Sequence, residues 1–225
     1  MDSKFLSFPS SAWSHEAQQQ VKPILAQIKQ LPFIKALGDG SLAPDKFRFY
    51  LQQDVLYLRH YSRIMQMIAD KCTLASDAEQ FQRFSSETIK AEQCMQQDLL
   101  QNNLTAAQQI PSCLLYTAFL YQQLITEPLP VAIASTLACF YIYQQVGEHL
   151  LARVDIHSNP YRRWIETYNC PEYCRDGAIA MNIADRLATN NNTEIRTSML
   201  HSFLTAAKLE KQLWHNCWQM SSWPL

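Results

Sequence analysis

The chain has 225 residues, a formal net charge of −1, 48% hydrophobic residues and 17% charged residues. This composition excludes a disordered chain, and the length suits one large domain, with two as the upper bound. No cluster or stripe of Lys and Arg occurs, so nucleic acid and an anionic membrane surface are poor candidates as partners.

The first residues and the cysteines indicate a cytoplasmic location. The N-terminal sequence MDSKFLSFPSSAWSHE lacks the basic start and the apolar run of a secretory signal peptide. The seven cysteines are scattered and odd in number, which favours free thiols over a disulfide framework. We therefore expect a reducing cytoplasm.

Helical spacing of apolar residues and a total of only four glycines predict an all-α fold, and no convincing period-two strand occurs. The loop GDGSLAP places Pro44 at a helix start. The segment SDAE is typical of a capping box, with Ser76 as the N-cap and Glu79 returning to it. Seven or eight helices are expected, near residues 13–30, 44–71, 77–101, 111–125, 131–153, 160–168, 172–187 and 193–219. They predict a single domain over residues 1–225.

One uncharged stretch resembles a membrane span. No charged residue occurs between Glu127 and Glu148, but the stretch opens with two prolines and contains Ser, Thr, Gln and Gly. A spanning helix needs ~20 predominantly apolar residues. We therefore expect a buried central helix and no membrane partner.

Two carboxylates interrupt apolar helical patterns. Asp54 lies near one face with Tyr57 and Tyr61, and Glu210 lies near Trp214. Spacing alone does not decide whether these two carboxylates belong to a site. Asp54 fits a solvated charge as well, and Glu210 fits a surface residue that pairs with a neighbouring lysine.

Cys139 and Tyr143 stand four residues apart in the uncharged stretch and so share a helical face. A free cysteine usually behaves as a small buried hydrophobe. Catalysis by this thiol requires a nearby base or cation that generates thiolate. Spacing alone favours the packing role.

Metal and cofactor signals are weak. Cys170 and Cys174 are separated by Pro171 and lack a partner pair at zinc spacing. The histidines form no HxxxH or HExxH pattern, and no Gly-rich phosphate loop occurs. We expect no metal and no cofactor. His15, in the first helix, is the one candidate haem ligand.

Five blocks in order carry a family resemblance that extends from about residue 13 to residue 220. They are LPFIKALGDGSLAPDKFRFYLQQDVLYL, PSCLLYTAFLY, ACFYIYQQVG, YRRWIETY and LEKQLW. With these blocks the chain resembles the TenA family, the thiaminase II or aminopyrimidine aminohydrolase enzymes. The resemblance implies a haem-oxygenase-like helical fold, a homotetramer, and hydrolysis of a 4-amino-2-methylpyrimidine at its 5-methylene. The implied substrate is thiamin or its aminomethylpyrimidine breakdown product.

The resemblance also implies roles for particular residues. Cys139 matches the nucleophile, Asp54 the carboxylate that holds the aminopyrimidine edge, and Glu210 the acid/base group. The matching pocket tyrosines are Tyr57, Tyr116, Tyr143 and Tyr168. Tyr141 points elsewhere on its helix and is assigned to packing.

Four positions depart from the family pattern, which raises the question of a different substrate range. They are Leu31, Leu114, Ala138 and Leu209. Two other functions stay open. One is a non-catalytic protein that binds thiamin pyrimidines, and the other is a haem-binding oxygenase that uses His15, suggested by fold analogy alone.

Overall fold

The computed structural model describes residues 12–98, 108–153 and 156–223, which form nine α-helices and no strand. The all-α prediction is confirmed. The helices are α1 (Trp13–Lys29), α2 (Pro32–Asp39), α3 (Pro44–Lys71), α4 (Ala75–Asp98), α5 (Pro111–Thr126), α6 (Leu129–Leu151), α7 (Arg162–Thr167), α8 (Pro171–Thr189) and α9 (Thr193–Gln219).

Helix α2 is the element that the sequence analysis did not separate. Pro32 occupies its first turn, and Gly40 ends it in the left-handed conformation with φ 76°. The segment expected as a loop from residue 38 therefore begins only at Gly40. The buried Asn159 amide fixes the end of α2 by donating to the carbonyls of Leu37 and Gly38 at 3.0 and 2.8 Å.

The predicted capping box is wrong. Helix α4 begins at Ala75, so Ser76 lies inside the first turn rather than before it. The carbonyl of Leu74 accepts from the backbone N–H groups of Asp77 and Ala78, at 3.1 Å each. This backbone geometry starts the helix two residues earlier than the capping pattern indicated. The expected residues 99–101 of this helix lie outside the described residues.

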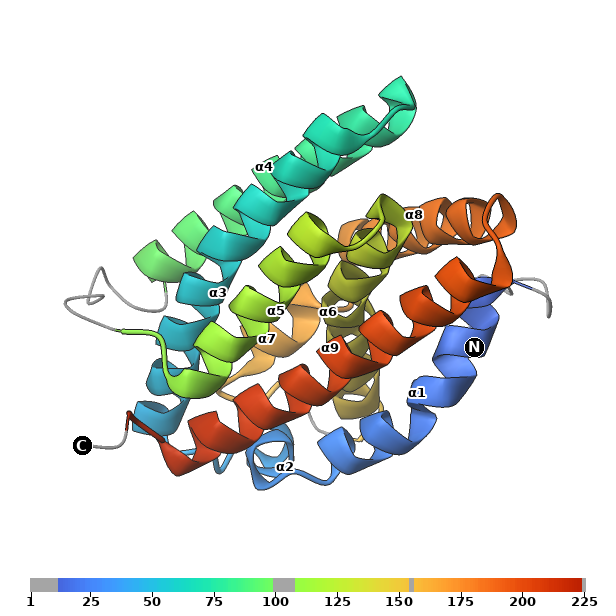
Figure 1. Ribbon diagram of the computed structural model, residues 1–225. Coiled ribbons are helices and arrows are strands. Elements are labelled where there is room, and N and C mark those ends of the chain that lie inside the picture. Colours follow the sequence, from blue (N-terminus) through green and yellow to red (C-terminus); the bar gives the residue numbers. More distant parts are fainter. Residues whose placement is uncertain (1–11, 99–107, 154–155, 224–225) are drawn as a thin grey trace.

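Helix α6 is the central element of the fold. It packs against α5, α8 and most extensively α9, which crosses it in Figure 1. Its first turns are buried from Val131 to Ala138, and small residues there allow neighbouring helices to approach closely. Among the described helices it is the one with the length and apolar composition of a membrane span, but most of it is buried in the fold, as expected for a core helix.

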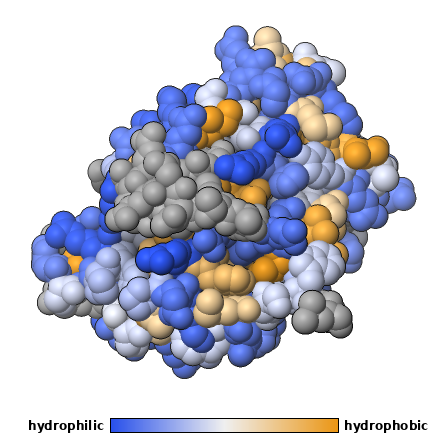
Figure 2. Space-filling view, turned by 90° about the vertical axis from the view of Figure 1, so that its left-hand side faces the viewer, coloured by the Kyte–Doolittle hydropathy of each residue, from blue (hydrophilic) through white to orange (hydrophobic). Residues whose placement is uncertain are grey.

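The surface is mixed in polarity. Figure 2 shows one face on which hydrophilic residues predominate and hydrophobic residues are scattered among them. All seven cysteines lie within the described residues and none of them forms a disulfide there, as predicted.

Helices α3 and α4 form a long antiparallel hairpin that projects from the body (Figure 1). Among the described elements, α4 packs extensively only against α3. Two ion pairs connect it to α8. Arg186 donates to Asp77 at 2.5 Å, and Arg83 donates to Asp176 at 2.5 and 3.1 Å. These two ion pairs bridge the space between α4 and α8.

Candidate active site

A cavity of about 130 Å³ lies between the α3–α4 hairpin and helices α6, α7 and α8. Asp54, Cys139, Tyr143 and Tyr168, four of the predicted site residues, line it. The cavity extends from Asp54, which is 2% exposed, to side chains of α4 at the surface. It is therefore a pocket with a deep end and an open rim.

Cys139 faces this cavity from α6. The Cys139 side chain is only partly buried, because one side of it faces the cavity. Burial raises the pKa of this thiol well above its usual value, and the nearby charges of Glu210 and Asp54 raise it further. The resting form is therefore the neutral thiol. Cys139 therefore does not serve only as a small hydrophobic residue packed in the core, because its side chain forms part of a cavity wall.

Asp54 lies on α3 with its carboxyl group buried at the deep end of the cavity. Its Oδ2 atom has no hydrogen-bond partner among the described residues. Burial raises the pKa of Asp54 to about 7, and hydrogen bonding with the nearby Tyr50 hydroxyl opposes this rise. The interpretation as a solvated charge is therefore wrong. An unpartnered carboxyl oxygen at this depth is suited to hydrogen bonding with a ligand.

Glu210, on α9, is also buried, at 1% exposure. Lys211 points away and donates to Gln27 at 2.7 Å, so the interpretation as a surface ion pair is wrong. Burial and then the charge of Asp54 raise the pKa of Glu210 to about 8, while the neighbouring Tyr116 hydroxyl and Cys139 thiol lower it. Neither carboxyl oxygen has a partner of good hydrogen-bond geometry among the described residues. Glu210 is next to Cys139 but does not line the described cavity.

The predicted tyrosines form two groups around these three side chains. Tyr57 packs on Tyr116, with ring centroids 5.0 Å apart, and both hydroxyls lack a partner in the described part of the chain. Tyr143 packs on Tyr168 at 4.6 Å, and its hydroxyl lies 3.1 Å from that of Tyr50. The rings form flat apolar walls, and their hydroxyl groups provide polar edges for orientation.

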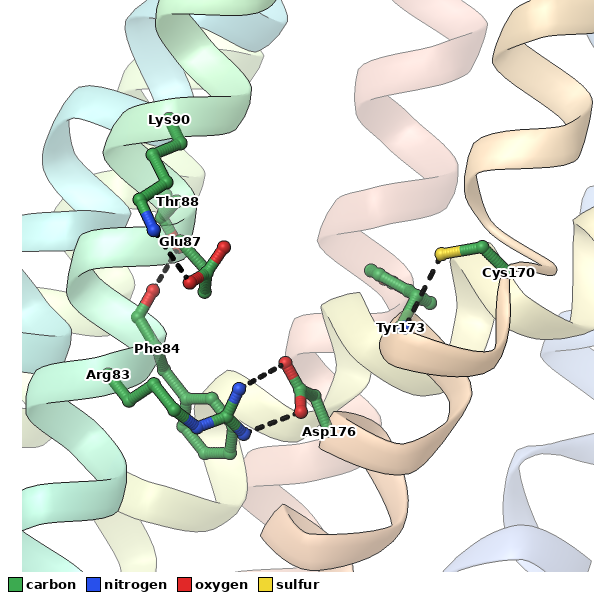
Figure 3. Close-up of polar contacts among 8 residues, drawn as sticks. All are labelled: Arg83, Phe84, Glu87, Thr88, Lys90, Cys170, Tyr173 and Asp176. Atoms are coloured by element: carbon green, nitrogen blue, oxygen red, sulfur yellow. Dashed lines mark hydrogen bonds and ion pairs between the residues drawn. The ribbon is translucent and has the colours of Figure 1, made fainter.

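Sequence reasoning missed most of the outer wall. Tyr173 packs against Phe140 at 5.7 Å, and Phe140 packs against Phe84 at 5.4 Å. Glu87 and Asp176 complete the rim, and Figure 3 shows how they approach from α4 and α8. Their sequence segments carry no signal of a site, because only the tertiary packing brings α4 and α8 together.

The four departures from the family pattern do not line the cavity. Leu114 is 41% exposed on the outer side of α5, and Ala138 and Leu209 are buried in the core. Leu31 directly precedes α2 and packs against the core. Tyr141 packs 6.2 Å from Phe203, as predicted. None of these four side chains therefore forms part of the wall of the described cavity.

Gly147 allows the chain around Tyr168 to approach α6. A Cβ atom at this glycine would lie 2.2 Å from Nδ2 of Asn169 and 3.3 Å from Cβ of Tyr168. The Asn169 amide donates to the carbonyl of Ile165 at 3.0 Å, so its displacement breaks this bond.

We expect Gly147→Ala to lower the free energy of unfolding by about 1–3 kcal/mol through overpacking. It should also weaken ligand binding, because Tyr168 shifts. Urea unfolding and calorimetric titration measure the two effects. The matched variant Gly177→Ala, where the nearest atom lies at 3.7 Å, should change stability much less. Equal effects of both variants would contradict this expectation.

Other candidate sites carry less chemistry. A larger, more open cleft of about 620 Å³ is lined by residues such as Lys29, His149 and Arg153, and by none of the predicted site residues. Among the described residues, no group of three His, Cys, Asp or Glu side chains is placed to hold a metal ion. His15 does not line the described cavity, so the geometry gives the haem-binding alternative no support.

The helical architecture and the internal pocket define a haem-oxygenase-like helical protein. A domain of unknown function with a heme oxygenase-like fold from Shewanella denitrificans os217 has a TM-score of 0.74 and 13% identity, with 92% of each chain covered. The TenA homologue from P. horikoshii OT3 has a TM-score of 0.83 and 21% identity, covering 93% of this chain and 100% of that one. Both likenesses show the fold.

The chain belongs to the TENA/THI-4/PQQC family, whose model matches residues 18–220. It is 27% identical over 205 residues to the aminopyrimidine aminohydrolase of Bacillus subtilis (strain 168), with 85% of this chain and 84% of that protein covered. The predicted family is thereby confirmed.

Proposed function

We propose that this protein is a cysteine-dependent hydrolase of thiamin-derived aminopyrimidines. Its substrate is 4-amino-5-aminomethyl-2-methylpyrimidine, and its products are the 5-hydroxymethyl compound and ammonia. The reaction recovers the pyrimidine half of degraded thiamin and is therefore a step of thiamin salvage. The similarity to an aminopyrimidine aminohydrolase supports this proposal.

One observation carries the proposal. A thiol, two buried carboxyl groups with unpartnered oxygens and a tyrosine wall come from separate helices and converge in one buried region. Unpartnered buried polar groups are costly, and they are tolerated where a ligand supplies the partners. An aminopyrimidine offers such partners through its ring nitrogens and amino group.

The size of the pocket bears on the substrate. A volume of about 130 Å³ is well below the ~300–1,000 Å³ of pockets that hold drug-sized ligands. One aromatic ring with short substituents suits this space, whereas the second ring of thiamin has to lie at the rim. We therefore propose the aminomethyl compound as the preferred substrate and thiamin as the poorer one.

The proposed chemistry begins with addition of Cys139 to the ring carbon beside the methylene-bearing carbon. The bound cationic substrate favours the ionised form of Glu210. This carboxylate takes the proton of the thiol as the S–C bond forms, so no resting thiolate is needed. Asp54, hydrogen-bonded to the aminopyrimidine edge, makes the ring more electron-poor. The electron pair of the former aromatic system expels the protonated amine as ammonia.

Water completes the cycle. Its oxygen bonds to the exocyclic methylene, the S–C bond breaks, and the ring becomes aromatic again. The water proton returns to the sulfur of Cys139, and Glu210 releases its proton to solvent. In the net reaction, the protonated amine and water give the alcohol, ammonia and a proton, so atoms and charge balance.

Ammonia release from the aminomethyl compound, with thiamin in parallel, tests the proposal. Release from the aminomethyl compound supports it. Binding of that compound without any release would instead support the non-catalytic alternative.

We also propose that the protein is cytoplasmic and assembles as a homotetramer. The free cysteines support the first statement. Apolar side chains exposed on α5 support the second, because Leu114, Leu115 and Ile125 are 41%, 51% and 69% exposed.

We expect sedimentation equilibrium to give four times the chain mass of 26.0 kDa. If the α5 surface is an interface, Leu115→Glu should dissociate the assembly, whereas Leu74→Glu, an exposed leucine at the start of α4, serves as the comparison. A monomeric wild-type protein would contradict the tetramer.

A further inference from the structure

The charged side chains that line the cavity are all acidic. They are Asp54 at the deep end and Glu87 and Asp176 at the rim. No Lys, Arg or His belongs to the lining that the structure describes. Glu210 adds a fourth carboxyl group directly behind Cys139. A ligand that enters this pocket therefore meets acidic groups at both ends.

Arg83 satisfies one of the two rim carboxylates. Its guanidinium group holds both oxygens of Asp176, at 2.5 and 3.1 Å, in the fork geometry seen in Figure 3. A two-point pair of this kind is geometrically specific and strong for its type. Arg83 therefore neutralises the charge of Asp176, and the pair connects α8 to α4.

Glu87 is the rim carboxylate that a ligand has access to. Glu87 forms an ion pair with Lys90 on the same helix, at 3.0 Å, and the lysine side chain is 69% exposed. Such surface pairs contribute only about 0–1 kcal/mol, so a ligand cation replaces the lysine at little cost. Figure 3 shows the Glu87 carboxylate directed into the space between α4 and α8.

Asp54, at the deep end of the pocket, orients the ligand independently of Glu87, and Glu210 lies behind the cavity wall next to Cys139. Oδ2 of Asp54 and both carboxyl oxygens of Glu210 lack partners in the described part of the chain. A ring held by Asp54 and attacked by Cys139 occupies the buried part of the pocket. Since the pocket opens beyond Cys139 toward Glu87, the methylene substituent lies between the thiol and the rim.

We propose that Glu87 determines specificity by binding the positive charge on the leaving group. It selects pyrimidines whose 5-methylene carries a cation over neutral compounds of the same size. This inference rests on the proposed function, because it assumes a pyrimidine in the pocket. A protonated amine is also the form that departs directly as neutral ammonia, so Glu87 admits the substrate in its reactive form.

Binding to two compounds of equal size tests the inference. The aminomethylpyrimidine carries a positive charge at neutral pH, and the hydroxymethylpyrimidine is neutral with the same number of non-hydrogen atoms. Both are titrated by calorimetry into Cys139→Ser protein, in which turnover does not obscure binding. The titration is repeated with Glu87→Gln added, and with Glu79→Gln added as a matched exposed glutamate of α4 that does not line the cavity.

We expect Glu87→Gln to weaken binding of the charged compound by about 5-fold and to leave the neutral compound unchanged. Added salt should reduce the difference between the two compounds only when Glu87 is present. Glu79→Gln should change neither affinity. Equal weakening of both compounds, or no weakening, would overturn the role of Glu87 and leave the proposed function intact. Failure of the Cys139→Ser protein to bind either compound would overturn both.

Discussion

Cys139→Ser protein is expected to release ammonia from the aminomethylpyrimidine roughly 10³-fold more slowly than wild type, or more slowly still. A serine hydroxyl is a much weaker nucleophile than a thiol toward an aromatic ring, and the buried carboxyl groups do not ionise it. The fold should survive, because the side chain faces the cavity and the change in volume is small. A coupled ammonia assay under single-turnover conditions measures the chemical step.

Cys72→Ser is the matched control for this loss. Cys72 lies directly after α3, where its backbone N–H caps the helix, and it does not line the cavity. Its substitution should leave the rate unchanged. Wild-type activity in the Cys139→Ser protein would exclude a covalent mechanism, and a loss in both variants would indicate damage to the fold instead.

Stability without ligand should fall as the pH rises from about 5 to about 8. Burial raises the pKa of Glu210 to about 8 and that of Asp54 to about 7, from ordinary values of 4.5 and 3.8. Between those limits the unfolded chain has released protons that the folded chain retains, so rising pH favours unfolding. The expected decrease in the free energy of unfolding is a few kcal/mol.

Glu210→Gln should remove the larger part of this dependence, because glutamine does not titrate. Urea unfolding at several pH values measures the slope. Glu194→Gln, an exposed glutamate in the first turn of the same helix, should keep the wild-type slope. If Glu210→Gln also keeps it, Glu210 does not retain its proton in the folded protein. A bound cationic ligand should flatten the wild-type curve, since it stabilises the ionised carboxyl groups.

The long helices could be predicted from the sequence because their apolar spacing and proline starts act locally. Helix α3 begins at Pro44 and ends at Lys71, as expected. The glycines near its end obscured the short helix α2 in the sequence. Gly38 is nevertheless helical, and of these two glycines Gly40 is the one with positive φ. Local patterns therefore placed the long helices, whereas the short helix between α1 and α3 was missed.

The site could be predicted only in part. Helical spacing left the burial of Asp54 and Glu210 undecided, and the family resemblance was needed to single them out. The structure brings both carboxyl groups to Cys139 and thereby excludes the surface interpretations, while their catalytic roles stay predictions. Glu87 could not be found from the sequence, because its place at the rim depends on how α4 packs beside the body.

The packing of α4 has a consequence for how substrate range can change. The thiol and the two carboxyl groups stand on α3, α6 and α9, whereas α4 contributes outer-wall side chains and packs extensively only against α3 among the described elements. Substitutions on the inner face of α4 therefore alter which molecules are admitted while the reacting groups keep their positions. If the proposed roles of these side chains hold, reactivity and selection depend on separate parts of the chain, so selectivity can change without loss of the existing chemistry.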